Sequence, residues 1–281
     1  MDVVNKKIKA DLHTHTNFSD GILSPEELVE KALKKGINIL SITDHDNISA
    51  IDNALKAAKK RDLEIIPGIE LSADFQGKEV HILAYFIDYK NKILKDYLEN
   101  FRDIRINRIK EMLKILNSEG IDLTYNDVLK SSEINGKASI GRPHLAKALV
   151  NEKHVKTIGE AFMKYIGDDK PAYVKKQNPT LKEIFKLINS IGGLSFLAHP
   201  GRTFRDVELT EFLDAGMDGI EVLHPSHSKD DAKYYSGLAS QYFLLESGGS
   251  DYHGISSTDN LNFGKYCIPA NYIINMKRRL F

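Results

Sequence analysis

Short runs of hydrophobic residues alternate with amphipathic segments of helical spacing over much of this 281-residue chain. A short hydrophobic run bounded by turn residues is typical of a buried strand. Seven strands are predicted, at residues 8–13, 38–42, 63–66, 80–87, 194–198, 219–223 and 244–249. Helical patterns separate most of them, so the chain is predicted to be an α/β protein with mainly parallel strands in a barrel or an open sheet.

The pattern changes between residues 92 and 178, where hydrophobic residues recur three and four positions apart. This spacing predicts a long amphipathic helix that ends near Gly120, followed by shorter helices. We therefore expect a mainly helical insertion that serves substrate recognition. The expected parts of the chain are a first barrel segment at 1–91, the insertion at 92–178 and a second barrel segment at 179–281.

Charge and composition change this picture little. Lys plus Arg number 39, as do Asp plus Glu, so no overall field favours membranes or long polyanions. The single cysteine, Cys267, excludes an intrachain disulfide, and no segment resembles a signal peptide or a membrane span. We expect a cytoplasmic protein with no membrane contact and no evident protein partner. A basic run on the long helix is predicted to be a solvated face rather than a nucleic-acid track: Arg102, Arg105, Arg108 and Lys110.

Candidate chemistry begins in the stretch ADLHTHTNFSD at residues 10–20. In an extended strand the side chains of residues i and i+2 lie on one face, so His13 and His15 point the same way. This is a metal-ligand geometry, although two exposed histidines would give the same pattern. Asp20 follows a polar turn and can offer a carboxylate to the same or a neighbouring ion.

More histidines and acids lie at or near the ends of predicted strands, and in barrels the C-terminal ends of the strands carry the chemistry. Nine donors can be counted: His13, His15, Asp20, His45, Glu70, His81, His199, Asp251 and His253. Nine donors suit three ions, or two ions with some donors orienting the others. Imidazole and carboxylate without thiolate fit manganese, iron or zinc, and we expect manganese first.

Several motifs together resemble those of the polymerase-and-histidinol-phosphatase (PHP) superfamily of metal-dependent phosphoesterases. They are DLHTHTNFSDG, TDHD, PGIE, EVHILAY, GRPHLAKAL, LAHPGR and GSDYHG. The resemblance is closer to stand-alone members that act as 3',5'-nucleoside bisphosphate phosphatases and 5'-to-3' exoribonucleases. It implies a distorted seven-stranded (β/α) barrel with a trinuclear metal centre at its C-terminal mouth.

The same resemblance implies how the ligands are shared. His13, His15, Glu70 and Asp251 would hold one ion. Glu70 would bridge to a second ion held with His81 and His199. The third ion would be held by Asp20, His45 and His253.

The expected reaction is hydrolysis of a phosphate monoester by metal-bound hydroxide. The expected substrate is the 3'-phosphate of a nucleoside 3',5'-bisphosphate, with 5'-to-3' trimming of short RNA as a further activity. His224 and His227 are the candidate general acids, and a mechanism with metal alone is the alternative. For phosphate binding we expect Arg142 and His144 of GRPH, and Arg202. GRPH would also fit a plain helix start with Pro143 in the first turn.

Three other functions remain open from the sequence. The first is a histidinol-phosphate or broad sugar-phosphate phosphatase. The second is a non-catalytic module that metal ions stabilise. The third is an amidohydrolase, which also uses an HxH motif on a barrel but usually needs a metal-bridging lysine, and no lysine lies at a predicted strand end.

Overall fold

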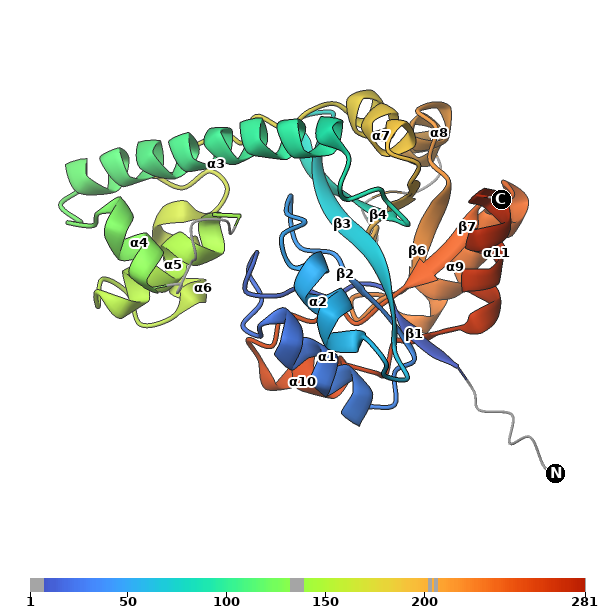
Figure 1. Cartoon of the computed structure of the whole chain (residues 1–281). Coiled ribbons are helices and arrows are strands. Elements are labelled where there is room, and N and C mark those ends of the chain that lie inside the picture. Colours follow the sequence, from blue (N-terminus) through green and yellow to red (C-terminus); the bar gives the residue numbers. More distant parts are fainter. Residues whose placement is uncertain (1–7, 132–138, 202–203, 205–206, 281) are drawn as a thin grey trace.

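The computed structural model describes residues 8–131, 139–201, 204 and 207–280. Its strands form one sheet in the order β7-β6-β5-β4-β3-β2-β1-β8 (Figure 1). The strands are β1 (Lys9–Asp11), β2 (Ile39–Ile42), β3 (Glu64–Phe75), β4 (Lys78–Tyr85), β5 (Leu194–Leu197), β6 (Gly219–Leu223), β7 (Leu245–Gly248) and β8 (Ile268–Pro269).

The sheet curls into a nearly closed barrel. Beyond the last residue of β1, the amide of Leu12 donates to the carbonyl of Gly248 at 3.2 Å, and Thr14 forms a parallel bridge with Tyr252. The two sides of the barrel therefore meet where the chain leaves β1 and β7. The helices of this part are α1 (Pro25–Lys34), α2 (Ile51–Ala58), α7 (Leu181–Ser190), α8 (Val207–Asp214), α9 (Lys229–Gln241), α10 (Ser257–Asn262) and α11 (Ala270–Leu280). The predicted α/β barrel is confirmed.

The sheet differs from the prediction in direction and in strand length. β3 and β4 form a long antiparallel hairpin that turns at Gln76 and Gly77, both of which have positive φ. β4 also runs antiparallel to β5. The strand expected at 63–66 continues to Phe75, and a two-residue strand, β8, pairs with β1 as an eighth strand. Because β4 runs antiparallel to both of its neighbours, the start of β4, not its end, lies beside the C-terminal ends of β3 and β5.

Local sequence signals fix where the first helix begins. The Ser24 hydroxyl accepts from the amide of Glu27, and the Glu27 carboxylate accepts from the amide of Ser24, which is a complete capping box. Pro25 occupies the first helical position, as the sequence predicts. The cap fixes the end of the loop that carries His13, His15 and Asp20.

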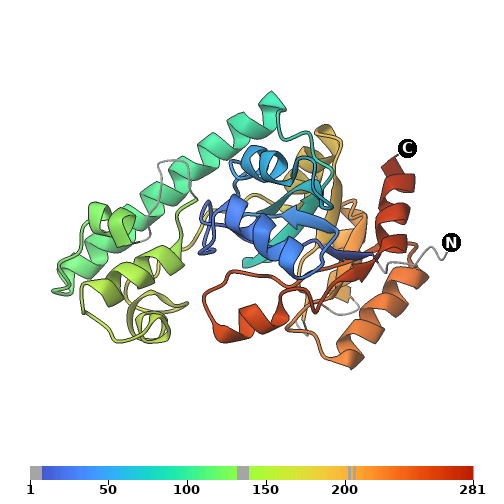
Figure 2. The same ribbon diagram turned by 60° about the horizontal axis from the view of Figure 1, so that its bottom comes forward.

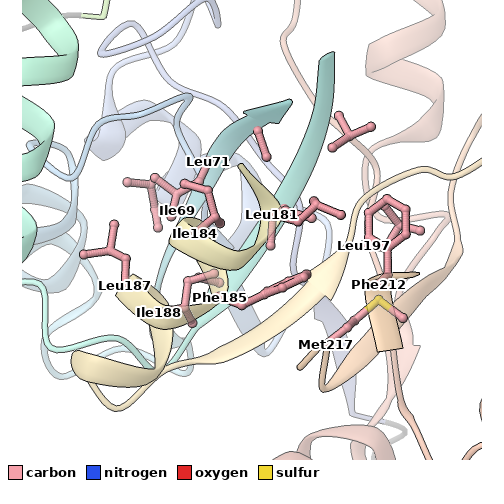
Figure 3. Packing of buried hydrophobic residues seen from close by; sticks show 14 of the residues in the cluster. Ile69, Leu71, Leu181, Ile184, Phe185, Leu187, Ile188, Leu197, Phe212 and Met217 are labelled. Atoms are coloured by element: carbon pink, nitrogen blue, oxygen red, sulfur yellow. The ribbon is translucent and has the colours of Figure 1, made fainter. Parts of the chain in front are cut away.

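The largest hydrophobic cluster lies between α7 and the sheet (Figure 3). Leu181, Ile184, Phe185 and Ile188 recur with helical spacing on α7 and are buried, as are Ile69 and Leu71 of β3, Leu197 of β5 and Phe212 of α8. This packing holds the hairpin β3–β4 against the rest of the barrel.

The helices between β4 and α7 lie to one side of the barrel (Figures 1 and 2). They are α3 (Lys92–Ser118), α4 (Tyr125–Ser131), α5 (Arg142–Asn151), α6 (Ile158–Ala161) and the π-helix η1 (Phe162–Ile166). Leu94 and Leu98 of α3 belong to the barrel cluster, whereas Ile109 and Leu116 belong to a second cluster with α5. A mainly helical insertion at 92–178 agrees with this packing, but its bounds stay a prediction. Within the described ranges, no helix combines the length and the apolar character that spanning a membrane would need.

We predict that Phe185→Ala lowers the free energy of unfolding by about 3–5 kcal/mol, because it leaves a cavity under the β3–β4 hairpin. Phe243→Ala is the matched control, since the Phe243 side chain is 83% exposed, and we expect a change below about 0.5 kcal/mol. Urea unfolding of both variants measures the difference. Equal losses would contradict the packing described for α7.

Candidate metal centre

All nine predicted donors converge at the mouth of the barrel, around the carboxylate of Glu70. Glu70 lies in the middle of β3 and is fully buried. Its Oε2 lies 3.1–3.3 Å, and its Oε1 2.9–3.0 Å, from ring nitrogens of five histidines: Oε2 faces His13, His15 and His45, and Oε1 faces His81 and His199. One carboxylate therefore joins ligands from four strands and the loops that follow them.

Two further carboxylates complete the group. Asp251 Oδ1 lies 3.3 Å from His13 Nε2 and 3.2 Å from His15 Nε2. Asp20 Oδ1 lies 3.1 Å from His253 Nε2, and its Oδ2 lies 3.7 Å from His45 Nε2. Asp251 also has a positive φ of 48°, a conformation that costs free energy and is often found at functional sites.

The residues fit divalent metal ions. His15 Nε2 and Asp20 Oδ1 are buried, and the polar atoms that they face, Asp251 Oδ1 at 3.2 Å and His253 Nε2 at 3.1 Å, belong to other predicted donors. Buried polar groups need such partners, and a shared cation would satisfy all of them at once. Groups of donor atoms lie within 4.8 Å of one another, as the ligands of one ion do. Among the described residues the groups are His15, Asp20, His45 and His253; His13, His15 and Asp251; His13, Glu70 and His199; His13, Glu221 and His224; and His45, Glu70 and His81.

The electrostatics of the cluster also favour cations. Burial raises the pKa of the Glu70 carboxyl, but the neighbouring histidines outweigh burial and hold this pKa well below its usual range. For His81, burial lowers the pKa, but Glu70 and Glu79 raise it to about 10. The pKa of His253 also reaches about 10, because Asp20 outweighs the effect of burial. Protons therefore occupy imidazoles that a metal ion would need, and metal binding would release them.

One residue of the centre was missed by sequence reasoning. Glu221 in β6 is fully buried; its Oε1 accepts from His13 Nδ1 at 2.9 Å and its Oε2 accepts from the amide of His199 at 2.7 Å. The first bond leaves His13 Nε2 free to face Glu70 and Asp251, so Glu221 orients a ligand. The sequence feature that could have identified Glu221 is its position as an acid between Ile220 and Val222, inside a predicted strand.

Two other acids, the buried Asp44 and the partly exposed Glu79, contact the loops and rings of the predicted ligands. Asp44 accepts from the amide and hydroxyl of Thr16 at 2.7 and 2.6 Å and from the hydroxyl of Ser19 at 2.6 Å, which fixes the loop that carries Asp20. Glu79 Oε1 lies 3.3 Å from His81 Nε2, the ring nitrogen that points away from Glu70. These contacts set the orientation of the ligands before any ion binds.

The two candidate general acids differ in their contacts. His224 Nδ1 lies 3.0 Å from the amide nitrogen of Ser226, which donates to it in the neutral ring, and 2.7 Å from the hydroxyl oxygen of Ser226, which can accept from it in the protonated ring. Its Nε2 lies 3.2 Å from Asp251 Oδ2. His227 is bonded to backbone at both nitrogens, since Nδ1 lies 2.9 Å from the carbonyl of Val222 and Nε2 accepts from the amide of Gly201 at 3.1 Å. Of the two, His224 has a ring nitrogen that faces a carboxylate of the donor cluster.

The predicted phosphate ligands also differ from one another. His144 is buried, with Nδ1 accepting from the amide of Gly141 and Nε2 2.7 Å from the carbonyl of Ser19, so it fastens α5 to the Asp20 loop. Neither of its nitrogens is available to a phosphate in this arrangement. Arg142 donates to Asp168 at 2.6 Å; the Asp168 side chain is 73% exposed, and that of Arg142 24%. Arg202 lies outside the described residues.

The prediction of a solvated basic face on α3 is wrong for two residues. Arg105 pairs with the buried Asp46, and its Nε donates to the carbonyl of Ile140 at 2.7 Å. Arg108 is only 9% exposed. Arg108 is covered by the returning segment, where its Nε donates to the carbonyl of Val174 at 2.7 Å, whereas Arg105 is held by the residue before Gly141 and by the loop after β2.

Comparison with known proteins places this site in a family. The model of the PHP domain matches residues 11–194. A 5'-3' exoribonuclease of Haemophilus influenzae is 33% identical over 251 residues, 87% of this chain and 90% of the relative. A 3',5'-nucleoside bisphosphate phosphatase of Chromobacterium violaceum is 33% identical over 248 residues, 86% of each chain. A solved structure from Bifidobacterium adolescentis, described as a metal-dependent phosphoesterase, has 30% identity and a TM-score of 0.88 over 96% of both chains.

We predict that Glu221→Gln weakens metal affinity or activity by about 10- to 100-fold, because the ring of His13 loses its anionic partner. Calorimetric titration with Mn²⁺ measures the change. Glu64→Gln is the control, since Glu64 is exposed at the start of β3. The Mn²⁺ affinity of this variant should match that of the unaltered protein. Unchanged affinity in Glu221→Gln would contradict the orienting role.

Metal affinity should rise with pH between about 6 and 9. The pKa values of His81 and His253 are raised to about 10, so these imidazoles hold protons at neutral pH and must lose them to bind an ion. Calorimetric metal titrations in buffers of different ionisation enthalpy should show that protons are released on binding. In a separate unfolding experiment, metal at about 1,000 times its Kd should raise the free energy of unfolding by about 4 kcal/mol per site. Binding that is independent of pH would contradict this account.

Proposed function

This chain belongs to the PHP domain family, and from that premise we propose that it removes the 3'-phosphate of nucleoside 3',5'-bisphosphates. It is a metal-dependent phosphoester hydrolase. The observation that carries the proposal is the convergence of nine imidazole and carboxylate donors on Glu70, beside a helical part that presents arginines. The relative from Chromobacterium violaceum, which matches over most of both chains, supports the choice of substrate.

We propose that the nine donors hold two or three divalent ions, with manganese first and iron or zinc as alternatives. When bound, such ions lower the pKa of a water, neutralise the phosphoryl oxygens and stabilise the leaving oxygen. The residues of the chain hold and orient the ions. Glu70 lies between the groups of donors, Glu221 orients His13, and Glu79 orients His81.

His224 is the proposed proton donor to the leaving oxygen. In its imidazolium form, His224 would pass its Nε2 proton to the 3'-oxygen as the bond between phosphorus and oxygen breaks, and a neutral imidazole would remain. The hydroxyl oxygen of Ser226, 2.7 Å from Nδ1, can accept the proton that Nδ1 keeps. Arg142 is the proposed ligand of the other phosphate, because a guanidinium can form two parallel hydrogen bonds to phosphate. Its present partner, Asp168, is 73% exposed and can give way to a stronger anion.

Trimming of short RNA from its 5' end is a second candidate function. The relative from Haemophilus influenzae, an exoribonuclease by name, supports it, as do the arginines on α3 and α5. A histidinol-phosphate or sugar-phosphate phosphatase has no need of arginines at this place. A non-catalytic module would not need a complete set of donors.

A substrate panel tests the proposed function. The purified protein, loaded with Mn²⁺, is assayed with adenosine 3',5'-bisphosphate, histidinol phosphate, p-nitrophenyl phosphate and a short 5'-phosphorylated RNA. We expect kcat/KM to be at least about tenfold higher for the bisphosphate than for histidinol phosphate, equivalent to one charge-assisted hydrogen bond. Preference for histidinol phosphate would overturn the substrate assignment. Metal binding without hydrolysis of any ester would favour the non-catalytic module.

His224→Asn should lower kcat for the bisphosphate by about 10²- to 10⁴-fold, because the poor leaving group loses its acid. Hydrolysis of p-nitrophenyl phosphate should fall much less, since p-nitrophenolate leaves without a proton. His227→Asn is the control, because both of its nitrogens are bonded to backbone. An equal fall on both substrates in His224→Asn would show that this histidine acts otherwise than as an acid.

A further inference from the structure

One buried ammonium group lies among the neighbours of two predicted metal ligands. Lys176 belongs to the segment that returns from the helical part to the barrel, and its side chain is only 6% exposed. Its Nζ lies 2.6 Å from Ser72 Oγ, 3.2 Å from Glu79 Oε1 and 3.8 Å from Asp46 Oδ2. Three polar groups from three different parts of the barrel therefore meet at one cation.

The contacts on one side of Lys176 lead to His81. Glu79 Oε1, which accepts from Lys176, also lies 3.3 Å from His81 Nε2, and Glu79 Oε2 accepts from the side-chain amide of Asn178 at 3.2 Å. Ser72 lies directly opposite His81 in the β3–β4 hairpin. The ammonium therefore contacts both the carboxylate beside the His81 ring and the residue that pairs with His81 across the hairpin.

The contacts on the other side lead to His45. Asp46, the next residue, has a φ of 47°, a left-handed conformation that costs free energy for a residue other than glycine. Its carboxylate accepts from the amide and the hydroxyl of Ser72 at 3.0 and 3.1 Å and also pairs with Arg105. Lys176 faces the same carboxylate oxygen as the Ser72 hydroxyl. The backbone conformation that directs His45 into the mouth of the barrel is therefore maintained by these contacts.

His45 and His81 face the two oxygens of one carboxylate. His45 Nδ1 lies 3.1 Å from Glu70 Oε2, His81 Nδ1 lies 2.9 Å from Glu70 Oε1, and the two ring centres are 4.8 Å apart. His45 belongs to two of the groups of donors within reach of one ion, which are His45, Glu70 and His81, and His15, Asp20, His45 and His253. A change in the separation of the two rings would therefore alter both groups.

The charge of Lys176 is the one that this place requires. The Asp46 side chain is 1% exposed and that of Glu79 35%, and buried carboxylates are costly without a cation beside them. The backbone, in contrast, docks the returning segment independently of the ammonium. The amide of Asp74 donates to the carbonyl of Pro179 at 2.7 Å, and Asp74 forms a parallel bridge with Thr180.

We propose that Lys176 is a positioning residue that sets the separation of His45 and His81, and thereby the metal affinity of the donor groups to which these two rings belong. The ammonium acts on His81 through Glu79, and on His45 through Ser72 and Asp46. This inference rests on the proposed function of the donors as metal ligands, and it gives Lys176 no contact with the substrate.

Calorimetric titration with Mn²⁺, without substrate, tests this role. Lys176→Met keeps most of the side chain and removes the ammonium, so at least one class of Mn²⁺ site should weaken by about 10- to 100-fold, as for other groups that orient ligands. The site of His13, His15 and Asp251 should stay within about twofold, because it does not share these contacts. Lys175→Met is the matched control, since the neighbouring Lys175 is exposed, and its titration should match that of the unaltered protein.

A comparison with Glu221→Gln shows whether the effect is local. Glu221 is the partner of His13, so Glu221→Gln and Lys176→Met should weaken different classes of site, and the double variant should weaken both. Weakening of the same class by both variants, equal weakening of all sites in Lys176→Met, or no weakening there would overturn the inference.

Ser72→Ala keeps the inference testable if Lys176→Met does not fold. It removes only the hydroxyl that joins the ammonium to Asp46, and it should weaken the same class of site as Lys176→Met by a smaller factor. Lys176→Met combined with Glu79→Gln should weaken that class by less than the product of the two single effects, because Lys176 acts partly through Glu79. Unchanged affinity in Ser72→Ala, or effects that multiply fully, would contradict the proposed path.

Kinetics at saturating Mn²⁺ separates a positioning residue from a substrate ligand. In Lys176→Met, KM for adenosine 3',5'-bisphosphate should stay within about twofold, because the ammonium does not bind the substrate. A large rise in KM with unchanged metal affinity would show that Lys176 binds a phosphate, and would overturn the inference. Preference of the unaltered protein for histidinol phosphate would overturn the proposed substrate but would leave the metal titrations, and with them the role of Lys176, intact.

Discussion

The structure depends on one buried carboxylate that is surrounded by imidazoles. Glu70 is fully buried, and five histidines from different parts of the chain place a ring nitrogen within 3.3 Å of its oxygens. A carboxylate in such a place stays ionised only because positive charge surrounds it, whether from protons or from metal ions. The histidines likewise lie close together only because anions separate them. Removal of either partner leaves buried charge of one sign.

This constraint explains why the barrel departs from uniform parallel order. Glu70 is reached from the side by His81, which lies near the start of β4. An antiparallel hairpin brings that end of β4 to the mouth without a crossover helix, whereas a parallel β4 would need one. The twelve residues of β3 extend beyond the mouth, so Glu70 is held on both sides, by β2 and the His45 segment on one and by β4 on the other.

Much of the donor set could be predicted from sequence, for a physical reason. Strand ends in a barrel meet at one mouth, so histidines and acids after short hydrophobic runs are predicted neighbours. The ring of His13 stacks on His199, and that of His15 on His253. Glu221 could not be predicted in the same way, because the partner of an acid inside a strand is known only once the opposite wall of the barrel is known. The prediction that Arg108 lies on a solvated face was wrong for a similar reason. The spacing of α3 shows which face is polar, but not that the segment near Val174 covers it.

The helical part is fastened to the neighbours of three metal-ligand candidates. Arg105 of α3 pairs with Asp46, the residue after His45. His144 of α5 bonds to the carbonyl of Ser19, the residue before Asp20. Lys176 holds Glu79, which contacts His81. Because each link ends one residue or one hydrogen bond from a donor, a shift of the helices must move the donors as well. If the arginines of the helical part bind substrate and the donors hold ions, as proposed, these contacts would couple substrate binding to donor geometry.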